Sequence, residues 1–163
     1  MGPSELLQGF PPIIDERARI LILGSFPSTA SLAAQQYYAH RQNQFWRLIS
    51  ALLEVPLVDR DYAARQQVLR DAGIAVWDVY ASCERAGSLD SAIRGAVLND
   101  FSRLGKLAPG LRRVCFNGQT AGRHARMFAG LGYATQLLPS TSPAYTLAFE
   151  QKLAAWRTPL LPE

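Results

Sequence analysis

The residues best suited to chemistry form short polar clusters that each follow an apolar run. In the first cluster, Gly24 lets a ligand approach the backbone closely, and the N–H groups near Ser25 and the hydroxyl of Ser28 could hold a phosphate or a carbonyl oxygen. The alternative is a plain strand-to-helix turn in which Ser28, Thr29 or Ser31 caps the helix. Neither a Walker pattern nor a G-x-G-x-x-G fingerprint occurs, so the chain has no common phosphate-loop motif.

Residues 37–46 bring aromatic, amide and cationic side chains together within ten positions. Aromatic faces stack on bases, and Asn and Gln amides pair with purine edges, so this stretch is suited to nucleic-acid contact. The alternative is that its last residues belong to the core of a following helix, with Asn43 as the cap. We accept that interpretation for Trp46, whereas Tyr37 and Tyr38 precede the helix in a polar stretch and stay candidate ligand contacts.

Two further polar residues directly follow apolar runs. Asp78 could accept a hydrogen bond from a ligand N–H group, or it could be a loop carboxylate paired with Arg85. Asn117 could face a ligand crevice, although a simple turn with Gly118 also explains its position.

The most unusual stretch ends at Pro143, where two prolines bracket the hydroxyl residues Ser140, Thr141 and Ser142. A rigid loop of this kind can contact phosphates through its hydroxyl and N–H groups. Its stiff apolar tip could also press into a duplex and help to expel a nucleotide. The same residues could begin a helix, with Ser142 as N-cap and Pro143 at the first helical position. The two roles are compatible.

The residues that usually bind metals are too few and too scattered for a metal site. His40 and His124 lie far apart, with no Glu at metal spacing. Cys83 and Cys115 cannot form a disulfide framework or a four-thiolate zinc or iron–sulfur site. We expect no metal and no cofactor, with Cys115 in the core and Cys83 in a polar loop.

The charge balance is mildly basic, with 17 Lys and Arg against 13 acidic residues and a net charge of +4. Fifteen of the 17 are Arg, because only Lys106 and Lys152 are lysines. Arg binds phosphates and base edges bidentately, but basicity of this size is weak evidence for a nucleic-acid partner. Neither lysine lies near a polar cluster in the sequence, which nearly excludes Schiff-base chemistry.

The clusters need a scaffold, and the apolar pattern predicts one. Near-continuous apolar runs predict buried strands at 18–23, 74–77, 113–116 and 134–138. The intervening patterns predict helices at 43–53, 62–71, 89–93, 98–107, 120–129 and 144–156. Strands that alternate with helices pair in parallel through right-handed crossovers. We therefore expect a three-layer α/β/α sandwich around a central, mainly parallel four-stranded sheet, with the ligand crevice outside the carboxyl ends of the strands.

Length and composition limit the remaining classes. A chain of 163 residues fits a single domain over 1–163, and 48% hydrophobic with 18% charged residues excludes disordered and collagen-like proteins. No window approaches the roughly 18 apolar residues of a membrane helix. Residues 1–16 lack the basic start and apolar run of a signal peptide. We expect a cytoplasmic protein with no membrane partner.

Four segments of the chain, in this order, resemble motifs of the uracil-DNA glycosylase superfamily. They are most similar to its hypoxanthine-DNA (deoxyinosine) glycosylase branch, the sixth family. The segments are residues 21–28, 37–46, 73–90 and 138–144. The resemblance runs from about Arg19 to Trp156, and four motifs in order are far more specific than any one. It implies a monofunctional DNA glycosylase that flips a deaminated base, first of all hypoxanthine, and hydrolyses its N-glycosidic bond to leave an abasic site.

One departure from the family pattern bears on the catalytic residue. Uracil-cleaving members carry Asp or Asn two residues after the opening Gly of the first motif, where it activates or holds the attacking water. Here Phe26 stands in that place and can do neither. The resembled branch shares this loss and uses an Asn further along, a place that Asn43 occupies. The resemblance implies that Asn43 orients the water or bonds the base, since an amide is a poor general base, and it argues against uracil as substrate.

The resemblance also implies how the base is held. Tyr38 stacks on the flipped base, while Phe26 lines its pocket. Asp78 or nearby backbone groups read the base edge, and the N–H groups near Gly24 and Ser25 stabilise charge on the leaving base, as an oxyanion hole does.

Contacts to the DNA backbone are implied for a second set of residues. These are Ser28, Arg41, Ser140, Thr141, Ser142 and Pro143. The loop from Ser140 to Pro143 also fills the gap left by the flipped nucleotide. We expect no lyase step and a monomer. The alternatives are a uracil or mismatch-type thymine glycosylase, a non-catalytic nucleic-acid-binding module, or a small enzyme of free nucleotides.

Overall fold

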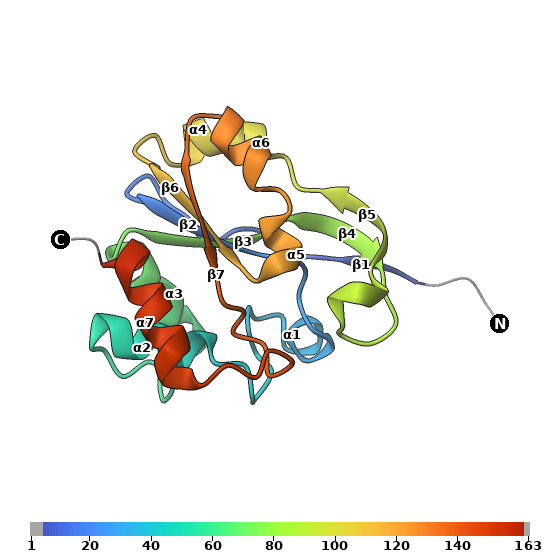
Figure 1. Ribbon diagram of the computed structural model, residues 1–163, viewed down its shortest axis with the longest axis horizontal. Coiled ribbons are helices and arrows are strands. Elements are labelled where there is room, and N and C mark those ends of the chain that lie inside the picture. The colour runs from blue at the N-terminus through green and yellow to red at the C-terminus, as the bar shows by residue number, and fades with distance from the viewer. Residues whose placement is uncertain (1–4, 162–163) are drawn as a thin grey trace.

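The computed structural model describes residues 5–161, and its centre is a four-stranded parallel sheet (Figure 1). From one side to the other the strands are β3 (Ile74–Asp78), β2 (Ile20–Gly24), β6 (Arg113–Asn117) and β7 (Ala134–Leu138). The register pairs Gly24 with Asp78 and Asn117 with Leu138, so neighbouring strands finish level with one another. All four predicted strands are confirmed, and the polar residues that follow them meet at one end of the sheet.

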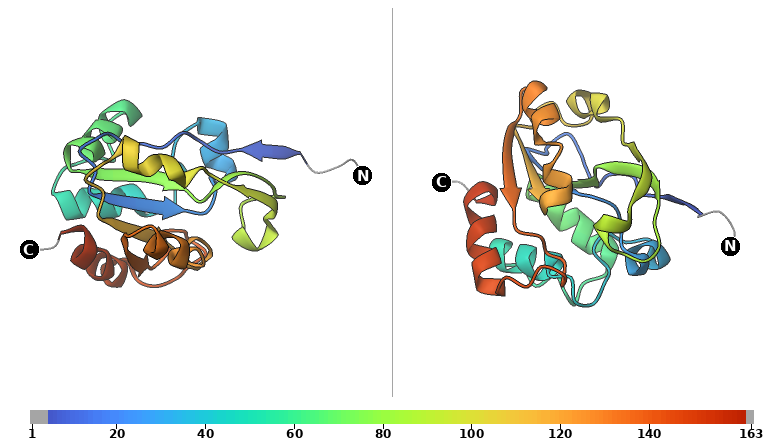
Figure 2. Two further views of the ribbon diagram at one scale, coloured as in Figure 1. Left: turned by 90° about the horizontal axis from the view of Figure 1, so that it is seen from above. Right: turned by 45° about the vertical axis from the view of Figure 1, so that its right-hand side comes forward.

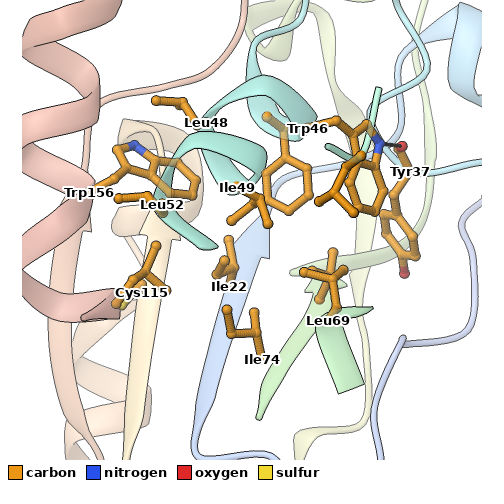
Figure 3. Close-up of a cluster of buried hydrophobic side chains, with 14 of the residues drawn as sticks. Ile22, Tyr37, Trp46, Leu48, Ile49, Leu52, Leu69, Ile74, Cys115 and Trp156 are labelled. Atoms are coloured by element: carbon orange, nitrogen blue, oxygen red, sulfur yellow. Dashed lines mark hydrogen bonds between the residues drawn. The ribbon is translucent and has the colours of Figure 1, made fainter. Parts of the chain in front are cut away.

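Helices lie on both faces of this sheet (Figures 1 and 2). They are α1 (Thr29–Ala34), α2 (Phe45–Leu53), α3 (Tyr62–Asp71), α4 (Leu104–Leu107), α5 (Gln119–Gly122), α6 (Ala125–Gly130) and α7 (Phe149–Leu160). One buried cluster joins Ile22 and Cys115 of the strands to the apolar sides of α2, α3 and α7 (Figure 3). A second cluster joins Leu23 and Phe116 to α4 and α6. Because successive strand residues point to opposite faces, the continuous apolar runs fill two cores at once, and the predicted three-layer sandwich is confirmed.

A second, antiparallel sheet extends from the first, and the sequence analysis did not predict it. Its strands are β1 (Leu6–Gln8), β4 (Tyr80–Glu84) and β5 (Arg94–Leu98), with β4 in the middle. Only Val79 separates β3 from β4, so one stretch of chain passes from the parallel sheet into the antiparallel one. Every residue of β5 is exposed, so no alternation of apolar and polar residues marks it as a strand.

Several predicted helices differ from those observed. The stretch 89–93 forms one 3₁₀ turn, η1 (Asp90–Ala92). In the stretch 98–107, Leu98 is taken by β5, and helix forms only over η2 (Phe101–Arg103) and α4. The helix predicted over 120–129 is two short helices, α5 and α6, that are separated at Arg123 and His124.

The loop after β7 is a turn rather than the start of a helix. Ser142 accepts the Ala144 N–H on its hydroxyl and the Tyr145 N–H on its carbonyl, both at 3.1 Å. The interpretation of Ser142 as a helix N-cap with Pro143 at the first helical position is therefore wrong, and α7 begins at Phe149. In contrast, Ser28 does cap α1, because its hydroxyl accepts the N–H of the residue three positions on.

Both cysteines are buried. Cys115 is a core residue as predicted, but Cys83 lies in β4 rather than in an exposed polar loop. Within residues 5–161, no helix is long and apolar enough to cross a membrane, and no group of three His, Cys, Asp or Glu side chains is placed to hold a metal ion. The expected domain over 1–163 includes residues 1–4 and 162–163, which lie outside the described residues.

Candidate active site

A cavity of about 330 Å³ opens at the carboxyl ends of the parallel strands. Its volume lies at the lower end of the range for pockets that take small ligands. Ten of the twelve predicted site residues line it: Gly24, Ser25, Phe26, Ser28, Tyr38, Asn43, Asp78, Ser140, Thr141 and Ser142. The other two, Arg41 and Pro143, are exposed and are not part of its lining.

Gly24 lies at the point where three parts of the cavity wall meet. A Cβ atom at this position would stand 2.6 Å from Asp78 Oδ1 and 2.8 Å from the Tyr38 hydroxyl oxygen. Both distances are shorter than real Cβ contacts, so the close approach of Asp78 and Tyr38 requires glycine here. Gly24 thus lets the cavity's own side chains approach its backbone, and its contact with a ligand stays a prediction.

Tyr38 is held in an uncommon backbone conformation. Its φ is +56°, in the left-handed region that costs a non-glycine residue about 1 kcal/mol or more. Its ring stacks on Phe45 with ring centres 4.2 Å apart. The neighbouring Tyr37 instead points into the core, where its hydroxyl donates to the Pro11 carbonyl at 2.9 Å (Figure 3). Both tyrosines line the cavity, but it is the ring of Tyr38 that stacks on Phe45.

Asp78 is a buried carboxyl with spare hydrogen-bonding capacity. Within residues 5–161, neither Asp78 Oδ2 nor the Tyr38 hydroxyl has a hydrogen-bond partner, although both atoms are buried. Burial, together with the negative charge of Asp90, raises the pKa of Asp78 to about 7 against the opposing positive charge of Arg85. The side chain therefore changes between a neutral donor–acceptor and an anionic acceptor near neutral pH.

Arg85 makes hydrogen bonds to two backbone carbonyls instead of pairing with Asp78. Its guanidinium donates to the carbonyl oxygens of Pro27 and Gly87, each at 2.6 Å, and lies 5.3 Å from the ring centre of Phe26. The alternative of an Asp78–Arg85 ion pair is therefore wrong. Arg85 is 8% exposed, and it positions the backbone on either side of the pocket.

Asn43 stands at the start of α2 and faces the cavity. Its Oδ1 accepts the N–H of Phe45 at 2.9 Å, which satisfies one of the free donors of the first helical turn. This bond fixes the orientation of the amide and leaves the Nδ2 hydrogens for a ligand or water. The N-cap of α2 is Gln44, so the interpretation of Asn43 as the cap is wrong, but the bond from Phe45 is compatible with the proposed catalytic role of Asn43.

The loop after β7 is fixed from two sides. Thr141 is buried, and it exchanges two hydrogen bonds with the Asn117 side chain while its carbonyl accepts the Gln44 N–H at 3.0 Å. From α7, Lys152 Nζ donates to the Tyr145 carbonyl at 2.8 Å and Trp156 Nε1 donates to the Pro139 carbonyl at 2.9 Å. The sequence separates both lysines from the motifs, but the fold brings Lys152 against this loop.

Sequence reasoning missed the segment 88–91, which lines the same cavity as that loop. Ser25 Oγ donates to Asp90 Oδ1 at 2.7 Å, and the Thr29 N–H donates to Ser88 Oγ at 2.9 Å. The segment was predicted as a helix and so was not considered as a pocket wall. Its place in the 73–90 motif was the one signal that pointed to it.

A polar cavity with aromatic walls at the carboxyl ends of the strands is typical of α/β proteins that bind a ligand beside a parallel sheet. Within that class, residues 11–161 match the model of the Uracil DNA glycosylase superfamily. The chain belongs to this superfamily.

Similar proteins occur in Methanosarcina. A hypoxanthine DNA glycosylase of Methanosarcina acetivorans is 41% identical over 149 residues, which are 91% of this chain and 94% of the relative. A hypoxanthine DNA glycosylase of Methanosarcina barkeri is 38% identical over the same shares. The solution NMR structure of a Methanosarcina acetivorans protein, described as a candidate uracil DNA glycosylase, has a TM-score of 0.87 at 39% identity, with 96% of this chain and 97% of that one covered.

Proposed function

We propose that the protein excises hypoxanthine from DNA by hydrolysing the N-glycosidic bond, leaving an abasic site. The observation that carries this proposal is the cavity itself, in which Asn43 is the oriented amide and the apolar ring of Phe26 lies where a water-binding residue would stand in a uracil enzyme. The two relatives named hypoxanthine DNA glycosylase support the choice of base. Because the bond is hidden in a duplex, the nucleotide must first be flipped into the cavity.

The flipped base lies beside Tyr38, whose ring is already stacked on Phe45. The left-handed backbone of Tyr38 presents the ring without a conformational change on binding. Phe26 forms an apolar wall of the same cavity. Aromatic and apolar walls suit a planar purine, and they exclude all but the positioned water.

Asp78 reads the edge of the base. In its neutral form the carboxyl accepts the N1–H of hypoxanthine on one oxygen and donates to O6 from the other. As the glycosidic bond breaks, negative charge develops on the base and the sugar becomes oxocarbenium-like. A donor at O6 and the N–H groups at Gly24 and Ser25 stabilise that charge. Asn43 places the attacking water or bonds the base, and it removes no proton.

The DNA backbone is held at the rim of the cavity. The exposed Arg41 contacts a phosphate, and Ser28 at the start of α1 contacts another. In the loop after β7, Ser140, Thr141 and Ser142 supply N–H and hydroxyl groups, while Pro143 is exposed at the turn. This loop presses against the strand from which the nucleotide is flipped.

The reaction is monofunctional, without a lyase step. A lyase needs a free amine to attack the sugar, but Lys152 is 1% exposed with its amine donating to the Tyr145 carbonyl, and Lys106 lies in α4, outside the cavity lining. We further propose that the chain acts as one uracil-DNA-glycosylase-like domain, as a monomer, in the cytoplasm and without a metal or cofactor.

The proposal is tested by single-turnover cleavage of labelled duplexes that carry one hypoxanthine, uracil, xanthine or undamaged adenine, with alkali added afterwards to nick abasic sites. Asn43→Ala, purified in parallel, reveals any contaminating glycosylase. We expect breaks at hypoxanthine only after alkali, and no borohydride-trapped covalent complex. Preferential cleavage at uracil would overturn the substrate assignment. Salt-sensitive duplex binding without any cleavage would instead favour a non-catalytic binding module.

A further inference from the structure

Leu89 is an exposed apolar side chain at the rim of the cavity. It is 62% exposed, more than any other large apolar side chain within residues 5–161, and it lines the cavity together with the loop after β7. It lies in the connection from β4 to β5, which curls toward that loop in each view (Figures 1 and 2). An exposed leucine at the mouth of a DNA-binding cavity is available to the bases of the duplex.

The backbone that carries Leu89 is fixed on both sides. Ser88 Oγ accepts the Thr29 N–H at 2.9 Å and donates to the Thr29 hydroxyl at 3.0 Å. Asp90 accepts the Ser25 hydroxyl at 2.7 Å. Arg94 closes the segment by donating to the carbonyls of Ser91 and Ile93, each at 2.9 Å. The polar neighbours are turned inward to these partners while the apolar side chain between them stays in solvent.

The loop after β7 carries one large exposed side chain, Tyr145, which is 46% exposed and lines the same cavity but is held by Lys152. In the loop after β7, Thr141 is buried, and the exposed apolar groups of its tip are the short Pro143 and Ala144. Tyr145 is larger, but its ring lies 5.4 Å from the Lys152 amine and its carbonyl accepts from that amine. A loop with these side chains can press on a backbone, but it fills little of the space of a purine nucleotide.

We propose that Leu89 is a second wedge, which enters the base stack and occupies the space vacated by the flipped nucleotide while the loop after β7 holds the backbone. The assignment rests on the proposed function, since it needs a nucleotide to be flipped. Wedge residues of this kind offset the cost of unstacking by filling the gap with apolar surface. The side chain matters for duplex substrates and is dispensable for single strands, which have no stack to repair.

The test compares Leu89→Ala with Leu131→Ala, which removes the same atoms from another exposed leucine, at the end of α6. Single-turnover rates are measured on hypoxanthine in a duplex and in a single strand. We expect Leu89→Ala to lose at least about tenfold on the duplex and less than about twofold on the single strand, with Leu89→Met restoring most of the rate. Leu131→Ala stays at the rate of the unchanged protein. Equal losses on both substrates, or no loss on either, would overturn the wedge.

A second readout does not depend on cleavage. A duplex carries 2-aminopurine beside a 2′-fluorinated deoxyinosine, which resists cleavage because fluorine disfavours an oxocarbenium-like sugar. We expect its fluorescence to rise on binding the unchanged protein and Leu131→Ala, and to rise far less with Leu89→Ala at equal occupancy. Equal rises for all three proteins would overturn the wedge. Failure of the unchanged protein to cleave hypoxanthine would overturn the proposed function, whereas this fluorescence comparison would still decide the role of Leu89.

Discussion

Asn117 and Thr141 are joined by two reciprocal hydrogen bonds. Asn117 Nδ2 donates to Thr141 Oγ1 at 3.0 Å, and the Thr141 N–H donates to Asn117 Oδ1 at 2.9 Å. The pair connects the end of β6 to the loop after β7 and lies in the wall of the cavity. One amide thereby fixes both the backbone and the side chain of a buried residue in a loop that we propose contacts DNA.

Asn117→Ala should release this loop. It leaves the Thr141 N–H and hydroxyl unpaired in a buried place, which costs about 1–3 kcal/mol of stability. We expect weaker duplex binding and slower cleavage than the unchanged protein, measured by fluorescence anisotropy and single-turnover kinetics. Gln136→Ala, at an exposed position in β7, serves as the control and should change neither. Full activity in Asn117→Ala would show that the loop holds its shape without the pair.

Asn43→Ala should lower the single-turnover rate by about 100- to 1000-fold while duplex binding is largely kept. It also removes the acceptor for the Phe45 N–H, which costs about 1 kcal/mol of stability. Asn43→Ser separates the two effects, because a serine hydroxyl can still accept the Phe45 N–H but cannot supply an amide. We expect this variant to recover thermal stability and not the rate. Recovery of both would assign Asn43 a structural role only.

Asp78 should make the cleavage rate depend on pH. Since its pKa is about 7, the proton that it donates to the base is lost above that pH. The rate on hypoxanthine should then fall by about tenfold for each further pH unit. Asp78→Asn keeps one donor and one acceptor without ionising, so its profile should be flat over the same range. A parallel fall in both proteins would place the titrating group elsewhere.

The same carboxyl should reduce the free energy of unfolding as pH rises. An unfolded Asp loses its proton near 3.8, whereas folded Asp78 keeps it to about 7, so the native state binds more protons in this window. The stability contributed by the protonated form is present below about pH 4 and is lost as pH rises to about 7. Relative to Asp78→Asn, the unchanged protein should lose up to about 1.4 kcal/mol per pH unit there, measured by urea unfolding. No change in that difference with pH would contradict the prediction.

Gly24→Ala should lower the cleavage rate by displacing side chains of the site while the fold is kept. The new methyl would meet Asp78 Oδ1 at 2.6 Å and the Tyr38 hydroxyl at 2.8 Å, so both side chains must move. We expect a loss of at least about tenfold in single-turnover rate, because small misplacements at a reacting centre cost rates of this order or more. Gly130→Ala, where an added Cβ meets nothing within 4 Å, is the matched control. Equal rates for the two variants would show that Asp78 and Tyr38 need no close approach to Gly24.

The strand framework could be predicted because its signal is local. Buried parallel strands such as β2 and β6 must be apolar on both faces, and the polar residues that follow them necessarily gather at one end of the sheet. The candidate site could be found for the same reason, since Gly24, Asp78 and Asn117 all end strands.

The remaining features depend on contacts that no local pattern records. The exposed strand β5 exists because it pairs with β4, and pairing leaves no periodicity when neither face is buried. Tyr37 and Tyr38 are adjacent and chemically identical, yet the Tyr37 hydroxyl bonds to the Pro11 carbonyl whereas Tyr38, at positive φ, stacks its ring on Phe45. Lys152 reaches its loop only because α7 packs back across the sheet.

Val79, the single residue between β3 and β4, also receives the chain when it returns. Its N–H donates to the Gly24 carbonyl at 2.8 Å, and its carbonyl accepts the Asn99 N–H at 2.9 Å. Both ends of the segment 80–98 are therefore held at Val79, beside the end of β2. Insertions or deletions within this segment leave the hydrogen bonds at Val79, and so the positions of both ends, unchanged. A longer or shorter hairpin grafted there would change the reach of the cavity's outer wall while Gly24 stays in place, which makes the hairpin the natural place to redesign which ligand the cavity accepts.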